Sequence, residues 1–392
     1  MRWGGEVAGT DRPRRAARVV RAVLPAVLAL AAPVWAGAPA RAASPEPSIR
    51  VLLLDGAKAV EVDGRTRTKP GRFRGPGPHE VDGRRVRGSI ELLVPRSEPT
   101  ASGEITKPGG LRVVNELPLE DYVAGTLLGE VVETWGDVVL RAQAVAIRTY
   151  ALHRRAHPRS PDYDVEASTR GQVYIGLDGE TERVREAVAA TRGEVLTWDG
   201  APILAAFHSA AGGRTASAEE VWGEALPYLV SVRIRGEEDS PDTYWRMRIA
   251  RDELEGALAA AGVDVGRLER VAVAARSESD RVRAVRIEGS RDAATLSGEA
   301  LRRALGASRL RSTVFDVRRA GDDFVFVGSG RGHGVGMSQW GARALARNGA
   351  SHAQILARFY PGARLERAAG RFALAGAGAL AARSAGLDGV AP

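Results

Sequence analysis

The chain has 392 residues, of which 44% are hydrophobic, 27% are charged and none is cysteine. A chain of this length and composition buries at least one sizeable core, so fibrous and wholly disordered proteins are excluded. Without cysteine, disulfides, thiolate zinc sites and cysteine nucleophiles are excluded as well. The net charge of +8 is concentrated in residues 1–42, which carry +5. Because the remainder is only mildly basic and 5% of residues are aromatic, we expect no nucleic-acid partner.

Residues 1–42 have the layout of a secretory signal peptide. Several arginines between residues 12 and 21 precede the apolar stretch 22–36, and Ala40-Arg41-Ala42 forms an A-x-A cleavage site. The apolar stretch is short and contains two prolines, which argues against a membrane-spanning helix. An uncleaved anchor stays open as an alternative. We therefore expect an exported protein that works in the periplasm, in the cell envelope or outside the cell.

Residues 43–110 are expected to form a small β-rich region. Residues 49–54 have the composition of a strand, and the Asp-Gly dipeptides at 63–64 and 82–83 are typical of hairpin turns. The Gly- and Pro-rich residues 69–78 are expected to form a loop.

From residue 111 the pattern becomes helical. Apolar residues at helical spacing predict a helix over 119–130, which ends before Gly136. A single apolar stripe predicts a second helix over 137–154, and a third helix over 180–192 ends at Gly193.

The following elements alternate between strands and helices. Residues 194–198 and 202–207 flank an Asp-Gly dipeptide, which predicts a hairpin. A helix is predicted over 338–347, and Ser351 and Gln354 form a capping box that begins a last helix.

These blocks predict an α+β fold in which helices pack on mixed and antiparallel strands. We place the main domain at residues 111–365, with an inserted α/β elaboration at about 233–325. The Ala- and Gly-rich residues 366–392 are expected to form a flexible tail.

The glycine-rich segment GSGRGHGVGMSQWG lies between a predicted strand and a predicted helix. A dinucleotide site has that arrangement, but the spacing does not match G-x-G-x-x-G, and no G-x-x-x-x-G-K-[ST] motif is present. We therefore expect no nucleotide ligand. The glycines indicate a tight turn and a close backbone approach. His333 in this turn is either a loop histidine bonded to backbone or a polar group that lines a cleft.

Two other histidine arrangements suggest chemistry. His208-Ser209 lacks the G-x-S-x-G context of a serine nucleophile, so a pair that lines a cleft is favoured. His153 and His157 are four residues apart on a predicted helix and have the spacing to chelate a metal. Neighbouring arginines repel a cation, so we expect a solvated helix end and no metal site.

Glu130 differs from the other carboxylates in its apolar surroundings. Leucine and valine occupy positions 127, 128, 131 and 132. Apolar walls remove water from a carboxyl, which raises its pKa and keeps it protonated near neutral pH. Such a group is the general acid that an ether-type leaving group requires. The alternative is a solvent-facing glutamate at a helix end; Glu133 is a nearby competitor, and Trp135 is a candidate to wall the site or stack on a sugar.

Five sequence blocks occur in a fixed order over about residues 111–365, apart from the insert. They are LPLEDYVAGTLLGEVVETW, LRAQAVAIRTYA, GQVY, the stretch from ETERVREAV to EEVWG, and GRGHGVGMSQWGARALA followed by ILARFYPG. Together they resemble the SpoIID/LytB domain family, which is named for stage II sporulation protein D. The catalytic glutamate of that family lies in an S-E-M-P-x-x-W stretch. That stretch reads G-E-V-V-E-T-W here and corresponds to Glu130.

The resemblance implies an exported lytic transglycosylase that acts on peptidoglycan glycan strands. Similar family members cleave the bond between N-acetylmuramic acid and N-acetylglucosamine, prefer strands without stem peptides and leave 1,6-anhydro ends. Glu130 is the implied catalytic acid, and Trp340 is equally well explained as a core residue. The implied substrate-binding residues are Gln143, Arg148, Gln172, Tyr174, His208, Ser209, His333, Ser338 and Gln339.

Some relatives hold zinc through histidine and cysteine residues just before the Q-V-Y sequence. Arg170 and Gly171 occupy those positions here, so the resemblance implies no zinc and no other cofactor. The LytB side of the family implies an alternative function. In that alternative the protein binds peptidoglycan without cleaving it and stimulates a cell-wall N-acetylmuramoyl-L-alanine amidase.

Overall fold

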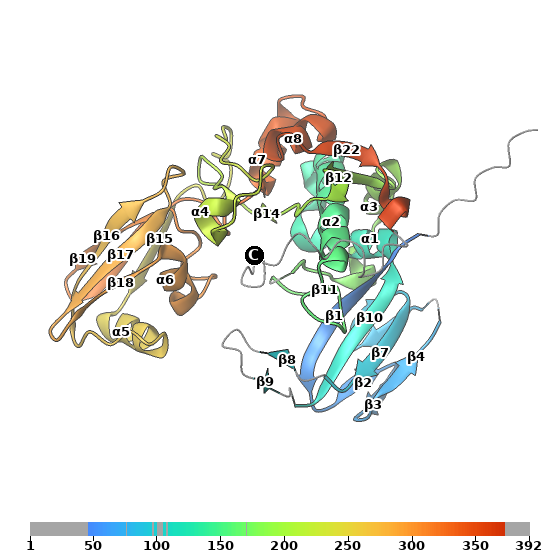
Figure 1. The fold of residues 1–392 in the computed structure, drawn as a ribbon, viewed down its shortest axis with the longest axis horizontal. Coiled ribbons are helices and arrows are strands. Elements are labelled where there is room, and N and C mark those ends of the chain that lie inside the picture. The colour runs from blue at the N-terminus through green and yellow to red at the C-terminus, as the bar shows by residue number, and fades with distance from the viewer. Residues whose placement is uncertain are drawn as a thin grey trace, which may run out of the picture. The chain divides into compact units, whose positions relative to one another are not determined.

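The computed structural model describes residues 46–75, 77–95, 98–99, 105–106, 109–169 and 171–372 (Figure 1). The predicted signal peptide lies outside the described residues, as does most of the predicted tail.

A five-stranded sheet joins the N-terminal region to the segment that follows it. The strand order is β11-β1-β10-β7-β4. The strands are β1 (Ser48–Ala57), β4 (Gly71–Phe73), β7 (Ser89–Leu93), β10 (Leu111–Pro118) and β11 (Val165–Glu166). β10 lies between β1 and β7 and is antiparallel to both. The domain boundary predicted between residues 110 and 111 therefore lies inside one structural unit, because strands distant in sequence pair across it.

The remaining N-terminal strands are short. They are β2 (Val60–Val62), β3 (Arg65–Arg67), β5 (His79–Val81), β6 (Arg84–Val86), β8 (Glu98–Pro99) and β9 (Ile105–Thr106). Asp63 and Asp82 have φ values of 52° and 46°, and each precedes a glycine with positive φ, so both predicted hairpin turns are confirmed. The predicted loop over 69–78 is wrong at Gly71–Phe73, because these residues pair with β7 at the edge of the larger sheet.

Two adjacent helices pack with the five-stranded sheet in one hydrophobic core (Figure 1). The helical elements here are α1 (Leu119–Glu130), η1 (Glu133–Trp135), α2 (Asp137–Ala156), η2 (Gly176–Gly179) and α3 (Glu182–Ala190). Both long helices are confirmed. α3 begins later than predicted because the Thr181 hydroxyl accepts a hydrogen bond from the Val184 N–H and caps the helix.

The C-terminal elements return to this same core. They are β12 (Glu194–Trp198), β13 (Ala201–Pro202), β14 (Phe207–His208), α4 (Ala218–Trp222), β21 (Met337–Ser338), α7 (Gln339–Arg347), α8 (His352–Phe359), β22 (Arg364–Arg367) and η3 (Ala369–Phe372). The Ser351 capping box is confirmed. The hairpin is shorter than predicted, because Phe207 and His208 pair with β21. The predicted start of the tail at residue 366 is also wrong, because β22 pairs with β12 and structure continues to Phe372.

Residues 245–328 form a second group of elements with its own hydrophobic core. The elements are β15 (Trp245–Ile249), α5 (Arg251–Ala260), β16 (Leu268–Arg276), β17 (Val282–Gly289), β18 (Ala293–Leu296), α6 (Gly298–Leu305), β19 (Phe315–Ala320) and β20 (Asp323–Gly328). The sheets have the orders β15-β20-β19 and β16-β17-β18. β20 leads directly into the glycine-rich segment, so the insert connects to the main core through that segment.

The predicted α+β class is confirmed by these separate helices and small, mainly antiparallel sheets. Among the helices that the structure describes, none has both the length and the apolar character that crossing a membrane requires.

Candidate active site

Glu130 is the last residue of α1, and a neighbouring loop packs directly on that end of the helix. Gly125 and Gly129 lie one turn apart on α1, and a Cβ atom at Gly129 would come within 1.9 Å of the Val173 carbonyl oxygen. The two glycines therefore allow residues 171–176 to contact the helix backbone. This contact places the Val173 nitrogen 2.7 Å from Oε1 of Glu130, to which it donates a hydrogen bond.

Glu130 keeps some exposed surface, yet the protein around its carboxyl removes most of the water. This burial raises the pKa of Glu130 from 4.5 to about 7, although hydrogen bonds from Val173 and Gln339 act in the opposite direction. The rise expected from the apolar sequence context is therefore confirmed. The carboxyl therefore holds its proton to a higher pH than an ordinary glutamate does.

Gln339 reaches Glu130 from the first turn of α7, and a network of hydrogen bonds fixes the start of that helix. The Ser338 hydroxyl caps α7 and donates a hydrogen bond to Glu237. Glu237 also accepts hydrogen bonds from the backbone N–H groups of residues 211–213, at 3.0, 3.1 and 3.3 Å. Glu237 thereby ties the loop after β14 to α7 and sets the position of Gln339.

Gln172 and Tyr174 support the loop that contacts Glu130. The Tyr122 hydroxyl donates a 2.8 Å hydrogen bond to Oε1 of Gln172, and the Tyr122 and Tyr174 rings are stacked with centroids 5.6 Å apart. The Tyr174 hydroxyl donates to Asn115 at 3.1 Å. Both Gln172 and Tyr174 are buried because the loop folds inward onto α1. Their predicted contact with substrate stays a prediction.

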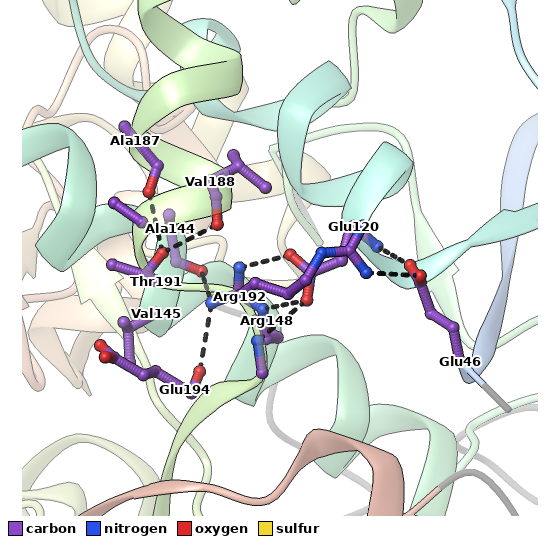
Figure 2. A network of polar contacts seen from close by, with 12 residues as sticks. Glu46, Glu120, Ala144, Val145, Arg148, Ala187, Val188, Thr191, Arg192 and Glu194 are labelled. Atoms are coloured by element: carbon purple, nitrogen blue, oxygen red, sulfur yellow. Dashed lines mark hydrogen bonds and ion pairs between the residues drawn. The ribbon is translucent and has the colours of Figure 1, made fainter. Parts of the chain in front are cut away.

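Arg148 is also buried rather than placed on a binding surface. Its guanidinium donates hydrogen bonds of 2.9 and 2.6 Å to the two carboxylate oxygens of Glu120, and a third bond of 3.1 Å to the Glu194 carbonyl (Figure 2). The Arg148 side chain has no exposed surface. An acidic side chain in α1 thus satisfies this arginine, and its predicted contact with substrate stays a prediction.

Glu133, the competitor to Glu130, lies in η1 and accepts a hydrogen bond from the Thr181 hydroxyl. This hydrogen bond connects η1 to the start of α3.

His208 and His333 contact each other in the interior, with ring centroids 5.5 Å apart. His333 Nε2 lies 2.9 Å from the Phe207 carbonyl, and its Nδ1 accepts a hydrogen bond from the Val335 N–H. Burial lowers the pKa of His333 to about 3 and also lowers that of His208, so both are neutral. The backbone-bonded alternative for His333 is confirmed. Both histidines are buried, and their predicted contact with substrate stays a prediction.

Two further predictions for α2 are corrected by burial. Gln143 is fully buried, and neither polar atom of its side chain has a hydrogen-bond partner among the described residues. His153 is buried against the Pro202 carbonyl, and burial lowers its pKa to about 3. The predicted solvated helix end is therefore wrong at His153.

A pair of partly exposed tryptophans lies next to Gln339. Trp135 and Trp340 have ring centroids 4.8 Å apart, and the Arg343 guanidinium lies 4.8 Å from the Trp340 ring and 5.9 Å from the Trp135 ring. The Trp340 backbone N–H donates a 3.0 Å hydrogen bond to the carbonyl of Ser209. Of the predicted binding residues, the structure thus brings Gln339 into contact with Glu130. It also shows that Trp340 is partly exposed rather than a core residue.

Sequence reasoning missed Arg343 and Glu237. Arg343 follows Gln339 by four residues on a predicted helix, a spacing that puts both side chains on one face. Glu237 carries no such local signal, because its partners are more than 20 residues away in sequence.

The described residues contain no group of three or more metal-binding side chains. Arg170, one of the two residues on which the zinc prediction rests, lies outside the described residues, so that prediction stays a prediction.

The fold and the site define an α+β protein with one partly buried, protonatable carboxyl beside an aromatic pair. The model of the family described as "Stage II sporulation protein" matches residues 107–198, and a model described as "Domain of unknown function (DUF8618)" matches residues 223–336. Stage II sporulation protein D of Bacillus subtilis is 30% identical over 65% of this chain and 76% of its own length. The Bacillus amyloliquefaciens protein of the same name is 32% identical, with the same coverage of both chains.

The chain therefore belongs to the stage II sporulation protein D family. It is also 28% identical to the protein named "Amidase enhancer" of Bacillus subtilis, over 62% of this chain and 40% of that protein.

Proposed function

We propose that this protein is an exported peptidoglycan lytic transglycosylase with Glu130 as its single acid and base. The proposed substrate is a glycan strand without stem peptides, cleaved between N-acetylmuramic acid and N-acetylglucosamine. The observation that carries the proposal is the pKa of Glu130, which burial raises to about 7 while the residue keeps some exposed surface. A group of this kind holds a proton at neutral pH and can still meet a substrate.

In the proposed mechanism, the Glu130 carboxylic acid donates its proton to the glycosidic oxygen as the bond from that oxygen to C1 of the muramic acid breaks. The ring then carries oxocarbenium character. The 6-hydroxyl of the same sugar attacks C1 and gives its proton to the Glu130 carboxylate. A 1,6-anhydro end results, the acid is restored, and neither water nor a second carboxylate is consumed, in contrast to paired-carboxylate hydrolases.

Two neighbours of Glu130 suit this cycle. The Val173 N–H and Gln339 donate to the carboxylate formed after the first proton transfer, so they stabilise it until the proton returns. Neither group is charged, and none of the described arginines is paired with Glu130. A permanent cation would keep the carboxyl ionised and remove the acid.

The test is digestion of purified glycan strands, with and without stem peptides, followed by mass spectrometry of the ends. The parent protein is expected to produce anhydro ends. Glu130→Gln is expected to lower their rate of formation by about 10²- to 10⁴-fold, the usual contribution of proton transfer. Glu133→Gln, three residues away, is the matched control and should retain cleavage. Anhydro ends that form at the parental rate in Glu130→Gln would exclude this acid.

The relation to the amidase enhancer favours a second candidate function. In that case the protein binds peptidoglycan without cleaving it and stimulates a separate cell-wall amidase. The second function predicts sedimentation with peptidoglycan, no anhydro ends from the protein alone, and faster amidase turnover in a mixture. If the parent protein forms anhydro ends in the absence of an amidase, the result supports the lytic transglycosylase and not the second function.

We also propose export and cofactor independence. Export rests on the sequence of residues 1–42, and cofactor independence rests on a reaction that needs only one carboxyl. Export is tested by locating the protein in fractionated cells, and cofactor independence by digestion in the presence of a chelator.

A further inference from the structure

Trp135, Trp340 and Arg343 form a surface patch that the proposed reaction does not use. The two rings are tilted by 58° to each other, and the Arg343 guanidinium lies over both. All three side chains are partly exposed, and Val132, between Glu130 and Trp135 in sequence, has 53% of its surface exposed. Aromatic rings and an arginine left accessible in this way are typical of a binding surface.

The patch has a fixed position relative to Glu130. Gln339, which is hydrogen-bonded to Glu130, and Arg343 are four residues apart in α7, so they lie on one face about one helical turn, or ~5.4 Å, apart. Trp135 is held in η1, five residues after Glu130. A ligand bound at Glu130 therefore has the aromatic pair and the guanidinium next to it.

The charge of Arg343 is available to a ligand. Its ion-pair partner is Asp239, at 3.4 Å, and Asp239 is itself 52% exposed. Asp239 makes a closer contact with Arg347. An exposed and shared ion pair of this kind contributes little energy in water, so a carboxylate on a ligand can replace Asp239 at small cost.

We propose that this patch is a binding subsite for a sugar ring that carries a free carboxylate, and that Arg343 is the residue that recognises the carboxylate. The proposal deepens the proposed function, on which it rests. The tryptophan faces would contact the apolar face of the ring, and the guanidinium fork would bind the lactyl carboxylate of N-acetylmuramic acid. A stem peptide converts that carboxylate into a neutral amide, which removes the charge. Arg343 thereby determines the specificity for strands without stem peptides.

The experiment measures binding by calorimetry in the Glu130→Gln background, so that nothing is cleaved. The two probes are one muramic acid-containing oligosaccharide with free lactyl carboxylates and the same oligosaccharide with every carboxylate converted to a methylamide. We expect the free acid to bind about tenfold more tightly, which corresponds to about 1.4 kcal/mol. Adding Arg343→Gln should reduce this ratio to below about twofold. Arg343→Lys, which keeps a charge but loses the fork, should give an intermediate ratio.

The matched control is Arg347→Gln, on the same helix and also in contact with Asp239, which should keep the tenfold ratio. Trp340→Ala should weaken the binding of both oligosaccharides by a similar factor. The proposal is overturned if the parent background does not distinguish the two probes, if it binds neither at millimolar concentration, or if Arg343→Gln leaves the ratio unchanged. Thermal unfolding of each variant separates lost recognition from lost folding.

The outcome is independent of whether the protein cleaves. A charge preference that Arg343→Gln abolishes supports the subsite even if the parent protein forms no anhydro ends, in which case only the proposed reaction fails. If the parent protein forms anhydro ends but Arg343→Gln leaves the ratio of the two binding affinities unchanged, only the subsite proposal is overturned.

Discussion

The two ends of α1 each carry a glutamate, and the two carboxyls have opposite kinds of partner. Glu120, in the first turn, is buried and forms a two-bond ion pair with Arg148, and the Gly193 N–H adds a further hydrogen bond at 3.2 Å. Glu130, at the last residue, has only the neutral donors Val173 and Gln339 and keeps some exposed surface.

The comparison shows how partners separate a structural carboxylate from a reactive one. A buried carboxylate with a matched cation stays ionised and has nothing left to offer a ligand. A desolvated carboxyl without a cation holds its proton to a higher pH and can transfer it. The same residue type in the same helix thus gives two roles, and the tertiary neighbours decide between them.

The largest expected effect comes from breaking the ion pair at the first end. Arg148→Met leaves the Glu120 charge buried and unpaired, so we expect the free energy of unfolding to fall by about 3–5 kcal/mol. Urea unfolding measures this change. Arg192→Met is the matched control: this neighbouring arginine is 63% exposed and is paired with Glu46 (Figure 2). It should cost less than about 1 kcal/mol. Equal losses in the two variants would contradict the structural role of the Glu120–Arg148 pair.

The second prediction concerns stability at the other end of the helix. The pKa of Glu130 is about 7 in the folded chain against 4.5 as the ordinary value. Between these pH values the folded chain binds the proton more tightly than the unfolded chain, so the parent protein loses stability as pH rises through this range. Glu130→Gln removes the ionisable group, and with it this loss of stability at higher pH. Its stability advantage should therefore be larger at pH 8 than at pH 4.5 by up to roughly 3 kcal/mol. Urea unfolding at the two pH values tests this, and a difference independent of pH would show that Glu130 is not desolvated.

The third prediction tests the contact that separates the two carboxyls. Gly129→Ala forces a methyl group against the Val173 carbonyl, so we expect a loss of about 1–3 kcal/mol. Gly256→Ala, in α5, is the matched control because a Cβ there meets nothing within 4 Å. That change should stabilise the helix by up to about 1 kcal/mol. Thermal unfolding compares the two, and a neutral Gly129→Ala would mean that the loop does not pack on α1 as described.

The smallest expected effect is a shift in the titration of Glu130. Gln339 stabilises the charged form of the carboxyl and lowers its pKa. Gln339→Leu should therefore raise the pKa of Glu130, by less than about one unit, since one unit corresponds to about 1.4 kcal/mol. Carboxyl ¹³C chemical shifts followed against pH measure the shift. A lowered pKa would show that Gln339 acts on Glu130 in another way.

Sequence patterns predicted the local elements well. The helices over 119–130 and 137–154, the Asp-Gly turns at 63–64 and 82–83, and the capping box at Ser351 follow from spacing, turn conformation and side-chain caps, which are local causes. The direction of the pKa shift of Glu130 was predicted from its apolar sequence context, and burial is its largest cause in the structure.

The other predicted binding residues show where local reasoning ends. Arg148, Gln172, Tyr174 and His333 are polar residues in matching motifs, and the resemblance to the family implied that they bind substrate. Their partners, such as Glu120 and Tyr122, come from distant segments. From the sequence alone, a polar residue that is buried with a partner cannot be distinguished from one that is exposed to a ligand.

The sequence by itself determined the α+β class, most helix positions and the direction in which the pKa of Glu130 is shifted, because these depend on periodicity, capping and adjacent apolar residues. Only the tertiary structure decided that β10 joins the N-terminal strands to the helical core, that Glu120 neutralises Arg148, and that Trp135, Trp340 and Arg343 gather beside Glu130. These depend on contacts between segments far apart in the chain, and such contacts are set by how the elements pack rather than by the residues next to them.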